Sequence, residues 1–340
     1  MGTYSRNVSI TDQVLILDGL TGTGKTMFGP ILGCLNGVQP GRFEYMMEYL
    51  SIVAESGHLE PEAAKSLIRT LVDVKTYDNS ISREVNFRPK DLSSVLKHGD
   101  RVKSLIQLMQ QDGTTAIKKL TNNPKVPFFI THQLYGCMDL LSKTYGDGLF
   151  IIEMVRHPFY LFDHWLSYLP YHGTSPHDFT LLLNIEGSEF PWFTHSFSEE
   201  YIDAKNEDRV ALAIAHLLEP ILGDLPNSSV SKQTLIIPFE QFVLNPHSFI
   251  TKIEQHTGRK FSKRINKVLT KQHVPRESVL AGPNLNIYRR YGFDPKSSLV
   301  SDRNSYLALE NRILPLLSDS VKNRFKGVAD AYEARFGLWF

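Results

Sequence analysis

Residues 19–26 hold the side chains with the clearest chemical meaning in the sequence. They read Gly-Leu-Thr-Gly-Thr-Gly-Lys-Thr, which fits G-x-x-x-x-G-K-[ST] at every fixed position. The glycines let main-chain N–H groups turn inward around a phosphate, the next helix aims its positive dipole end at that anion, and Lys25 adds a point charge. The pattern therefore predicts a loop that binds nucleotide phosphates. Its expected contact residues are Gly22, Thr23, Gly24, Lys25 and Thr26.

A second candidate for phosphate binding is Arg156. It comes directly after the apolar stretch 149–155 and is followed by His157 and Pro158. A guanidinium group can bind phosphate oxygens through two parallel hydrogen bonds, so a second phosphate contact is expected here. The open alternatives are an arginine that caps a sheet edge and one that pairs with Glu153.

These side chains need strands that end at a common edge. Short apolar runs rich in β-forming residues predict buried strands at 14–17, 127–131, 149–155 and 234–238. Helical spacing of apolar residues is found at 40–75, 100–109, 113–120, 208–222 and 246–256, and a helix-compatible segment at 27–35 follows the loop. Within 40–75, Glu60-Pro61-Glu62 predicts the start of a second helix. This alternation predicts an α/β fold, a three-layer sandwich with a mainly parallel central sheet flanked by helices, in which ligands bind at the carboxyl ends of the strands.

The composition fits a large α/β protein. We expect a single domain over all 340 residues, with a helical insertion at about 40–120 and a C-terminal helical segment at about 300–340. The 37 basic and 36 acidic residues give a net charge of +1, so no overall field favours nucleic acid or an anionic membrane. No signal peptide is found, and no apolar run approaches the roughly 18 residues of a membrane helix, so we expect a cytoplasmic protein.

The motifs, in their order along the chain, resemble those of sulfotransferases that use 3′-phosphoadenosine 5′-phosphosulfate (PAPS). That family has a 5′-phosphosulfate loop, a strand ending in Thr-His, a strand ending in V-x-R-x-P, a late strand followed by an acidic residue, and a basic loop with glycine. The matching segments here are Gly22–Thr26, Ile130–His132, Val155–Pro158, Pro238–Phe242 and Tyr288–Gly292. The resemblance spans about residues 14–293.

The resemblance implies transfer of a sulfuryl group from PAPS to an acceptor hydroxyl, for which a carbohydrate is one candidate. It implies that Gly22–Thr26 hold the 5′-phosphosulfate, with Lys25 stabilising charge on the bridging oxygen. His132 would be the general base that takes the hydroxyl proton, since a neutral imidazole can accept it near working pH. The 3′-phosphate would be bound by Arg156, Arg289 and Arg290.

Three positions depart from the family pattern. Lys25 lies where ATP-binding loops carry their lysine, and the family's earlier lysine position is Thr21-Gly22. The family's serine eight residues beyond the arginine is His164, which can also donate a hydrogen bond to phosphate. Ile130 replaces the lysine that often precedes Thr-His.

Two other functions stay open on the sequence. A kinase or NTPase that uses ATP with Mg²⁺ would need Thr26 as a ligand and a carboxylate at the tip of a buried strand. Asp18 precedes the loop and Glu153 lies inside its strand, so neither fits that position clearly, whereas sulfuryl transfer requires no metal ligand. The third function is a nucleotide-binding protein without catalysis.

Overall fold

The computed structural model describes residues 4–89, 94–95, 101–109, 113–223, 228–282 and 301–340. Its centre is a five-stranded sheet in which every pair of neighbouring strands is parallel. The strand order is β2 (Arg42–Phe43), β3 (Phe128–Ile130), β1 (Val14–Gly19), β4 (Leu149–Val155) and β7 (Thr234–Pro238). The predicted α/β fold with a mainly parallel sheet is therefore confirmed.

The central strand β1 is buried on both faces because its side chains alternate between two hydrophobic clusters. Leu15 and Leu17 belong to one cluster, and Val14 and Ile16 belong to the other. This two-sided burial explains why the strand reads as a continuous apolar run rather than as an alternating one.

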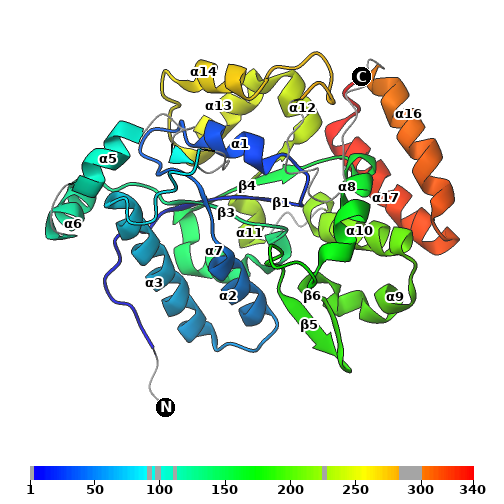
Figure 1. The fold of residues 1–340 in the computed structure, drawn as a ribbon, viewed down its shortest axis with the longest axis horizontal. Coiled ribbons are helices and arrows are strands. Elements are labelled where there is room, and N and C mark those ends of the chain that lie inside the picture. Colours follow the sequence, from blue (N-terminus) through cyan, green and yellow to red (C-terminus); the bar gives the residue numbers. More distant parts are fainter. Residues whose placement is uncertain (1–3, 90–93, 96–100, 110–112, 224–227, 283–300) are drawn as a thin grey trace.

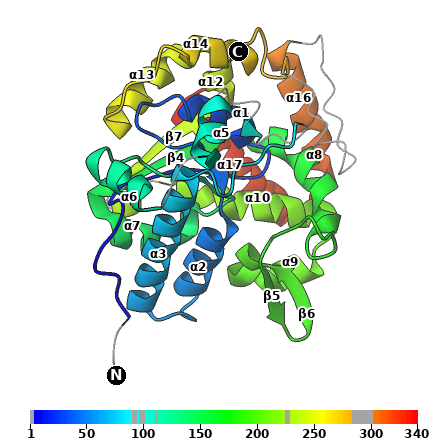
Figure 2. The same cartoon turned by 60° about the vertical axis from the view of Figure 1, so that its left-hand side comes forward.

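Helices cover both faces of the sheet (Figures 1 and 2). On the face of Leu15 and Leu17 lie α1 (Lys25–Leu32), α12 (Phe239–Leu244), α13 (Pro246–Thr257) and α14 (Ile265–Lys271). On the face of Val14 and Ile16 lie α2 (Tyr45–Glu55), α3 (Pro61–Ser80), α7 (Asp139–Tyr145) and α11 (Ser229–Lys232). The arrangement is the expected sandwich of helices, sheet and helices.

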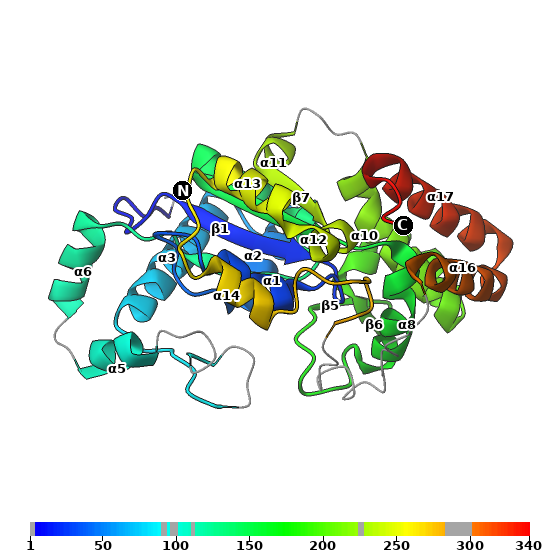
Figure 3. The same cartoon turned by 90° about the horizontal axis from the view of Figure 1, so that it is seen from above.

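Further helices gather beyond the carboxyl ends of the strands, as the view from above shows (Figure 3). They are α8 (Pro158–Tyr168), α9 (Ser198–Asp203), α10 (Asn206–Leu222), α16 (Asp302–Ile313) and α17 (Asp319–Phe336). The short antiparallel hairpin of β5 (Leu182–Ile185) and β6 (Ser188–Pro191) lies near α9. At the opposite end of the molecule are α5 (Arg101–Met109) and α6 (Gly113–Asn122). No helix within the described ranges is long and apolar enough to cross a membrane.

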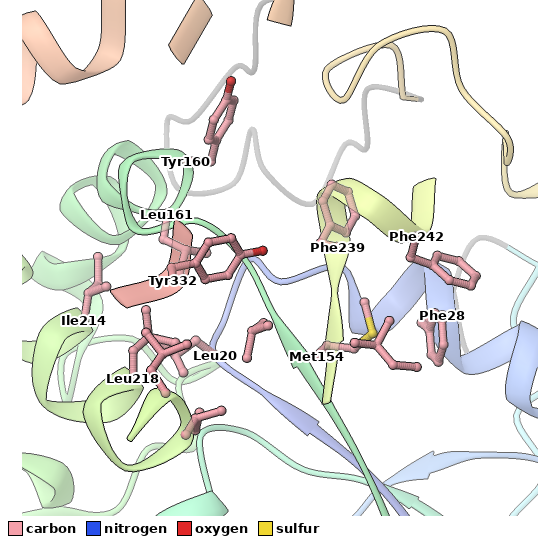
Figure 4. Close-up of a cluster of buried hydrophobic side chains, with 14 of the residues drawn as sticks. Leu20, Phe28, Met154, Tyr160, Leu161, Ile214, Leu218, Phe239, Phe242 and Tyr332 are labelled. Carbon is pink, nitrogen blue, oxygen red and sulfur yellow. The ribbon is translucent and has the colours of Figure 1, made fainter. Parts of the chain in front are cut away.

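Aromatic side chains connect the helices to the strand ends (Figure 4). The ring of Phe28 on α1 meets that of Phe242 on α12 with centroids 4.6 Å apart. Tyr332 of α17 is fully buried, and its hydroxyl donates to the carboxylate of Glu240 on α12 at 2.6 Å. The C-terminal helix is thereby fixed to the end of β7.

The helical prediction for 40–75 was wrong at its start, because Arg42 and Phe43 form β2 at the sheet edge. The second helix start predicted at residues 60–62 is confirmed, since α3 begins at Pro61 with Glu60 as its N-cap. Helix α1 begins two residues earlier than predicted, at Lys25, and ends at Leu32. The break between α2 and α3 has a local cause. Gly57 adopts φ +76°, a left-handed conformation that favours glycine, and Glu60 then caps α3.

Candidate functional site

Parallel strands bring four connecting segments to one edge of the sheet. They are the glycine-rich loop 19–26 after β1, residues 131–134 after β3, residues 156–158 after β4, and residues 239–240 after β7. The loop after β1 lies in the middle, because β1 is flanked by β3 on one side and β4 on the other. Direct contacts join the other three segments to it.

The loop has the conformation that its glycines allow. Gly22 and Gly24 adopt φ values of +95° and +94°, which residues with a Cβ rarely take up. A Cβ on Gly24 would also lie 2.6 Å from the Phe239 ring. Gly24 is the N-cap of α1, so the first N–H groups of that helix lack partners inside the helix and are turned toward the loop. This arrangement can bind an anion.

Lys25 is buried inside the loop. Its Nζ donates to the carbonyl oxygens of Gly19 and Leu20, the latter at 3.1 Å. Burial lowers the pKa of Lys25, and the nearby carboxyl groups of Asp18 and Glu153 oppose that change. The ammonium group is therefore at the centre of the loop, held by main-chain oxygens.

Asp18 fixes the segment after β3 against the start of the loop. One carboxylate oxygen accepts from the Thr131 hydroxyl at 2.8 Å, and the other accepts from the main-chain N–H of Leu134 at 2.7 Å. The N–H of Gln133 also donates to the carbonyl oxygen of Gly19 at 3.1 Å. These bonds hold His132, in the middle of the segment, beside the loop.

His132 is held by a carboxyl group and by aromatic rings. Its Nδ1 is 2.9 Å from Oε1 of Glu48. The imidazole stacks on Phe43 and Tyr45, with centroid separations of 5.1 and 5.6 Å and interplanar angles of 12° and 8°. Burial and the Lys25 charge lower the pKa of His132, although 24% of its side chain is exposed. The neutral imidazole is therefore the favoured form.

Glu48 was not predicted as a site residue. It lies in the first turn of α2, is almost fully buried, and has its pKa raised to about 8 by that burial. The only sequence signal for its role is that a glutamate lies on the helix face that also buries Met47 and Ile52. Its contact with His132 could not be predicted, because the two residues are 84 positions apart in the sequence.

Arg156 reaches the other side of the loop. Its Nη1 donates to the carbonyl oxygen of Gly22 at 2.9 Å, and its guanidinium carbon lies 4.6 Å from the centroid of the Phe239 ring. The pairing with Glu153 that the sequence left open is not formed, because the carboxylate near Arg156 is that of Glu240, 3.9 Å from Nε. Nε is buried and makes no hydrogen bond within the described residues, so Arg156 retains donor capacity.

Helix α8 adds two more side chains to the loop. A Cβ on Gly22 would lie 2.7 Å from Nδ1 of His164, so this imidazole lies directly against Gly22. Trp165 Nε1 donates to the carbonyl oxygen of Thr21 at 2.9 Å. Burial, with the charges of Arg156 and Lys25, lowers the pKa of His164 to about 4.

The structure thus brings the loop residues, His132, Arg156 and His164 to one sheet edge. Arg289 and Arg290 lie outside the described residues. Arg276, which was not predicted, lies over the same Phe239 ring as Arg156, with its guanidinium carbon 5.4 Å from the ring centroid. In the described part of the chain no group of three or more His, Cys, Asp or Glu side chains could hold a metal ion.

No family model matches the chain, and no curated protein matches it. Three solved structures similar to it are sulfotransferases. The sulfotransferase domain of the Synechococcus PCC 7002 olefin synthase is 11% identical with a TM-score of 0.43, covering 98% of both chains. The sulfotransferase domain from the curacin biosynthetic pathway is 11% identical with a TM-score of 0.46, covering 94% of this chain and 97% of the other. Mouse sulfotransferase SULT7A1, complexed with PAP, is 11% identical with a TM-score of 0.34, covering 93% of this chain and 90% of the other. At these values the likeness assigns no activity.

Proposed function

We propose that the protein transfers a sulfuryl group from PAPS to an acceptor hydroxyl. The observation that carries this proposal is the placement of His132 and Arg156 on opposite sides of the phosphate loop, after the two strands that flank β1. A base on one side and a guanidinium on the other are what a hydroxyl acceptor and a phosphorylated nucleotide would each require.

The residues present fit the donor. Gly22–Thr26 offer inward N–H groups and a helix N-terminus to its 5′ end, where it carries the activated sulfuryl group. The buried Nε of Arg156 makes no hydrogen bond to a described residue, and a second anionic group such as the 3′-phosphate could accept from this guanidinium. His164, against Gly22, can donate a hydrogen bond to the same nucleotide.

The chain's own groups have distinct tasks in this proposal. His132, neutral because its pKa is lowered, accepts the proton of the acceptor hydroxyl. Lys25 and the loop N–H groups stabilise the negative charge that develops at the bridging oxygen, after Lys25 exchanges its bonds to Gly19 and Leu20. The acceptor would approach beside the rings of Phe43 and Tyr45, on which a sugar ring can stack, so a carbohydrate remains a candidate.

ATP chemistry with Mg²⁺ has less support from the geometry. Asp18 and Glu153, two carboxyl groups near Lys25, are fully buried inside strands. Both oxygens of Asp18 already accept hydrogen bonds from Thr131 and Leu134. Thr26 would therefore lack the carboxylate at a strand tip that a nucleotide-bound Mg²⁺ requires.

A calorimetric comparison of 3′,5′-bisphosphoadenosine with AMP tests the role of Arg156. The wild type should bind the bisphosphate more tightly, and Arg156→Ala should lose ~1–3 kcal/mol of that preference, the size of a charge-assisted contact. Arg209→Ala is the matched control, because Arg209 also lies over an aromatic ring and donates to main-chain carbonyls, but belongs to α10. Equal affinity of the wild type for both nucleotides would contradict the proposal.

A further inference from the structure

One oxygen of Glu48 meets two donors of the same residue. Oε1 accepts from the main-chain N–H of His132 at 3.1 Å and lies 2.9 Å from its Nδ1. A main-chain N–H can only donate, so Oε1 is an acceptor toward it. A carboxyl oxygen has two lone pairs in its plane, and the second is then directed at Nδ1. With Oε1 as the acceptor in both contacts, the imidazole hydrogen lies on Nδ1 and a lone pair is left on Nε2.

The surroundings keep the imidazole in this orientation. Phe43 and Tyr45 stack nearly parallel to it, and Asp18 fixes the neighbouring residues Thr131 and Leu134. Nε2 makes no hydrogen bond to any described residue, so it stays open for an incoming group.

Several titratable groups face this pair. They are Lys25 from α1, Asp18 from β1, and Glu44 and Tyr49 from α2. Burial raises the pKa of Glu48 to about 8, and a proton on its Oε2 leaves Oε1 an acceptor toward both donors. Oε1 therefore accepts from both donors when Glu48 is ionised and when its proton lies on Oε2, whereas a proton on Oε1 would be donated to Nδ1 and would give the other tautomer.

We propose that Glu48 is the positioning residue for His132, holding the imidazole in the tautomer with hydrogen on Nδ1 so that Nε2 accepts the hydroxyl proton. That this proton transfer takes place during catalysis rests on the proposed function. As the acceptor oxygen bonds to sulfur, its O–H bond breaks and the proton moves to Nε2. The bond from sulfur to the bridging oxygen breaks, and that oxygen leaves with the electron pair.

The tautomer can be measured without any turnover, by ¹⁵N NMR of histidine-labelled protein with the His132 signals assigned. In the wild type Nε2 should be unprotonated. Glu48→Gln, whose side-chain carbonyl can replace Oε1, should keep this tautomer, whereas Glu48→Ala should give a mixture of both. Glu44→Gln is the matched control, because Glu44 is also a buried carboxyl group of the α2 N-terminus but bonds Met46 rather than His132. A wild type protonated at Nε2, or an unchanged tautomer in a folded Glu48→Ala protein, would overturn the proposal.

Kinetics separates this inference from the proposed function. Glu48→Ala should lower kcat by about 10–100-fold, with the affinity for 3′,5′-bisphosphoadenosine unchanged, as expected when a base loses its orienting partner. Glu48→Gln should recover most of the rate, and Glu44→Gln should match the wild type. Equal loss in Glu48→Gln and Glu48→Ala would contradict a positioning role. If the wild type transfers no sulfuryl group, the proposed function fails, while the NMR result still decides the assignment of the tautomer.

Discussion

Lys25 is a buried lysine whose hydrogen bonds go to main-chain oxygens. Its ammonium group is bonded to carbonyl oxygens of its own loop, and its pKa is lowered by desolvation. A bound phosphate would supply the anionic partner that these neutral oxygens do not. If a phosphate binds in the loop, Lys25 would therefore gain a favourable interaction with its negative charge.

We predict that Lys25→Ala weakens binding of 3′,5′-bisphosphoadenosine by ~1–3 kcal/mol, the range for a charge-assisted contact. Isothermal titration calorimetry measures the change directly. Lys143→Ala, which removes an exposed lysine paired with Asp139 on α7, should leave the affinity unchanged. Unchanged affinity in Lys25→Ala would show that the loop does not bind phosphate in the expected manner.

His132 should act on the transition state rather than on nucleotide binding. His132→Ala is expected to lower turnover by ~10²–10⁴ with little change in nucleotide affinity, because a general base is needed only when the proton moves. Since its pKa is lowered, the imidazole stays neutral below its ordinary range, and the acid limb of the wild-type rate should lie below pH 6.5. Rates at several pH values for both proteins check this.

A His132→Ala protein with near-normal turnover and the same acid limb would assign the base elsewhere. His157 is a poor replacement, because it is fully buried and its Nε2 lies 3.2 Å from the carboxylate of Glu333. His164, against Gly22, would then be the next candidate.

The strands were the elements that the sequence predicted best. β4 and β7 have the predicted bounds, because each is a buried apolar run that no helix of typical length could occupy. β2 was missed because it has two residues, and β5 and β6 because they form a hairpin with little apolar alternation, away from the central sheet. Their pairing depends on tertiary contacts, which a local pattern does not contain.

Residues of the candidate site were predicted where they belong to a contiguous motif. They were missed where they come from elements far apart in the sequence. The glycine-rich loop reads directly from residues 19–26, and His132 and Arg156 follow buried strands. Glu48 and Arg276 reach the same region from other elements, and their positions depend on how α2 and the segment after α14 pack. The contribution of Arg289 and Arg290 stays a prediction.

Glu153 shows how a strand can carry a carboxyl group inside the core. Burial raises its pKa well above the ordinary value, and the register of β1 and β4 pairs it with Asp18. The folded protein therefore binds the Glu153 proton more tightly than the unfolded chain, whose carboxyl group loses it near its ordinary pKa of 4.5. Stability from this group is lost as the pH rises above that value, since the unfolded state then binds fewer protons.

We predict that Glu153→Gln gains stability relative to the wild type between pH 5 and pH 7, by at most about 1.4 kcal/mol per pH unit. Urea unfolding of both proteins at the two pH values measures the free-energy difference. Glu62→Gln, at an exposed carboxylate of α3, is the control. The difference between its free energy of unfolding and that of the wild type should change little with pH. A difference between Glu153→Gln and the wild type that does not change with pH would contradict a raised pKa.

At the scale of the whole molecule, charge is balanced overall, and three basic side chains belong to segments near the glycine-rich loop. The net charge is +1, yet Lys25, Arg156 and Arg276 belong to segments that meet near Phe239 and the loop. Binding of an anionic nucleotide would therefore depend on this local cluster rather than on a general field. Its affinity should fall as salt screens these charges.

The most direct test of the central claim is a titration of the wild-type protein with 3′,5′-bisphosphoadenosine and, separately, with ATP and Mg²⁺. A sulfotransferase that holds its donor through the loop and Arg156 should bind the bisphosphate more tightly, and without any requirement for Mg²⁺. Tighter binding of ATP with Mg²⁺, or binding of the bisphosphate only when Mg²⁺ is present, would contradict the account and favour a kinase or NTPase.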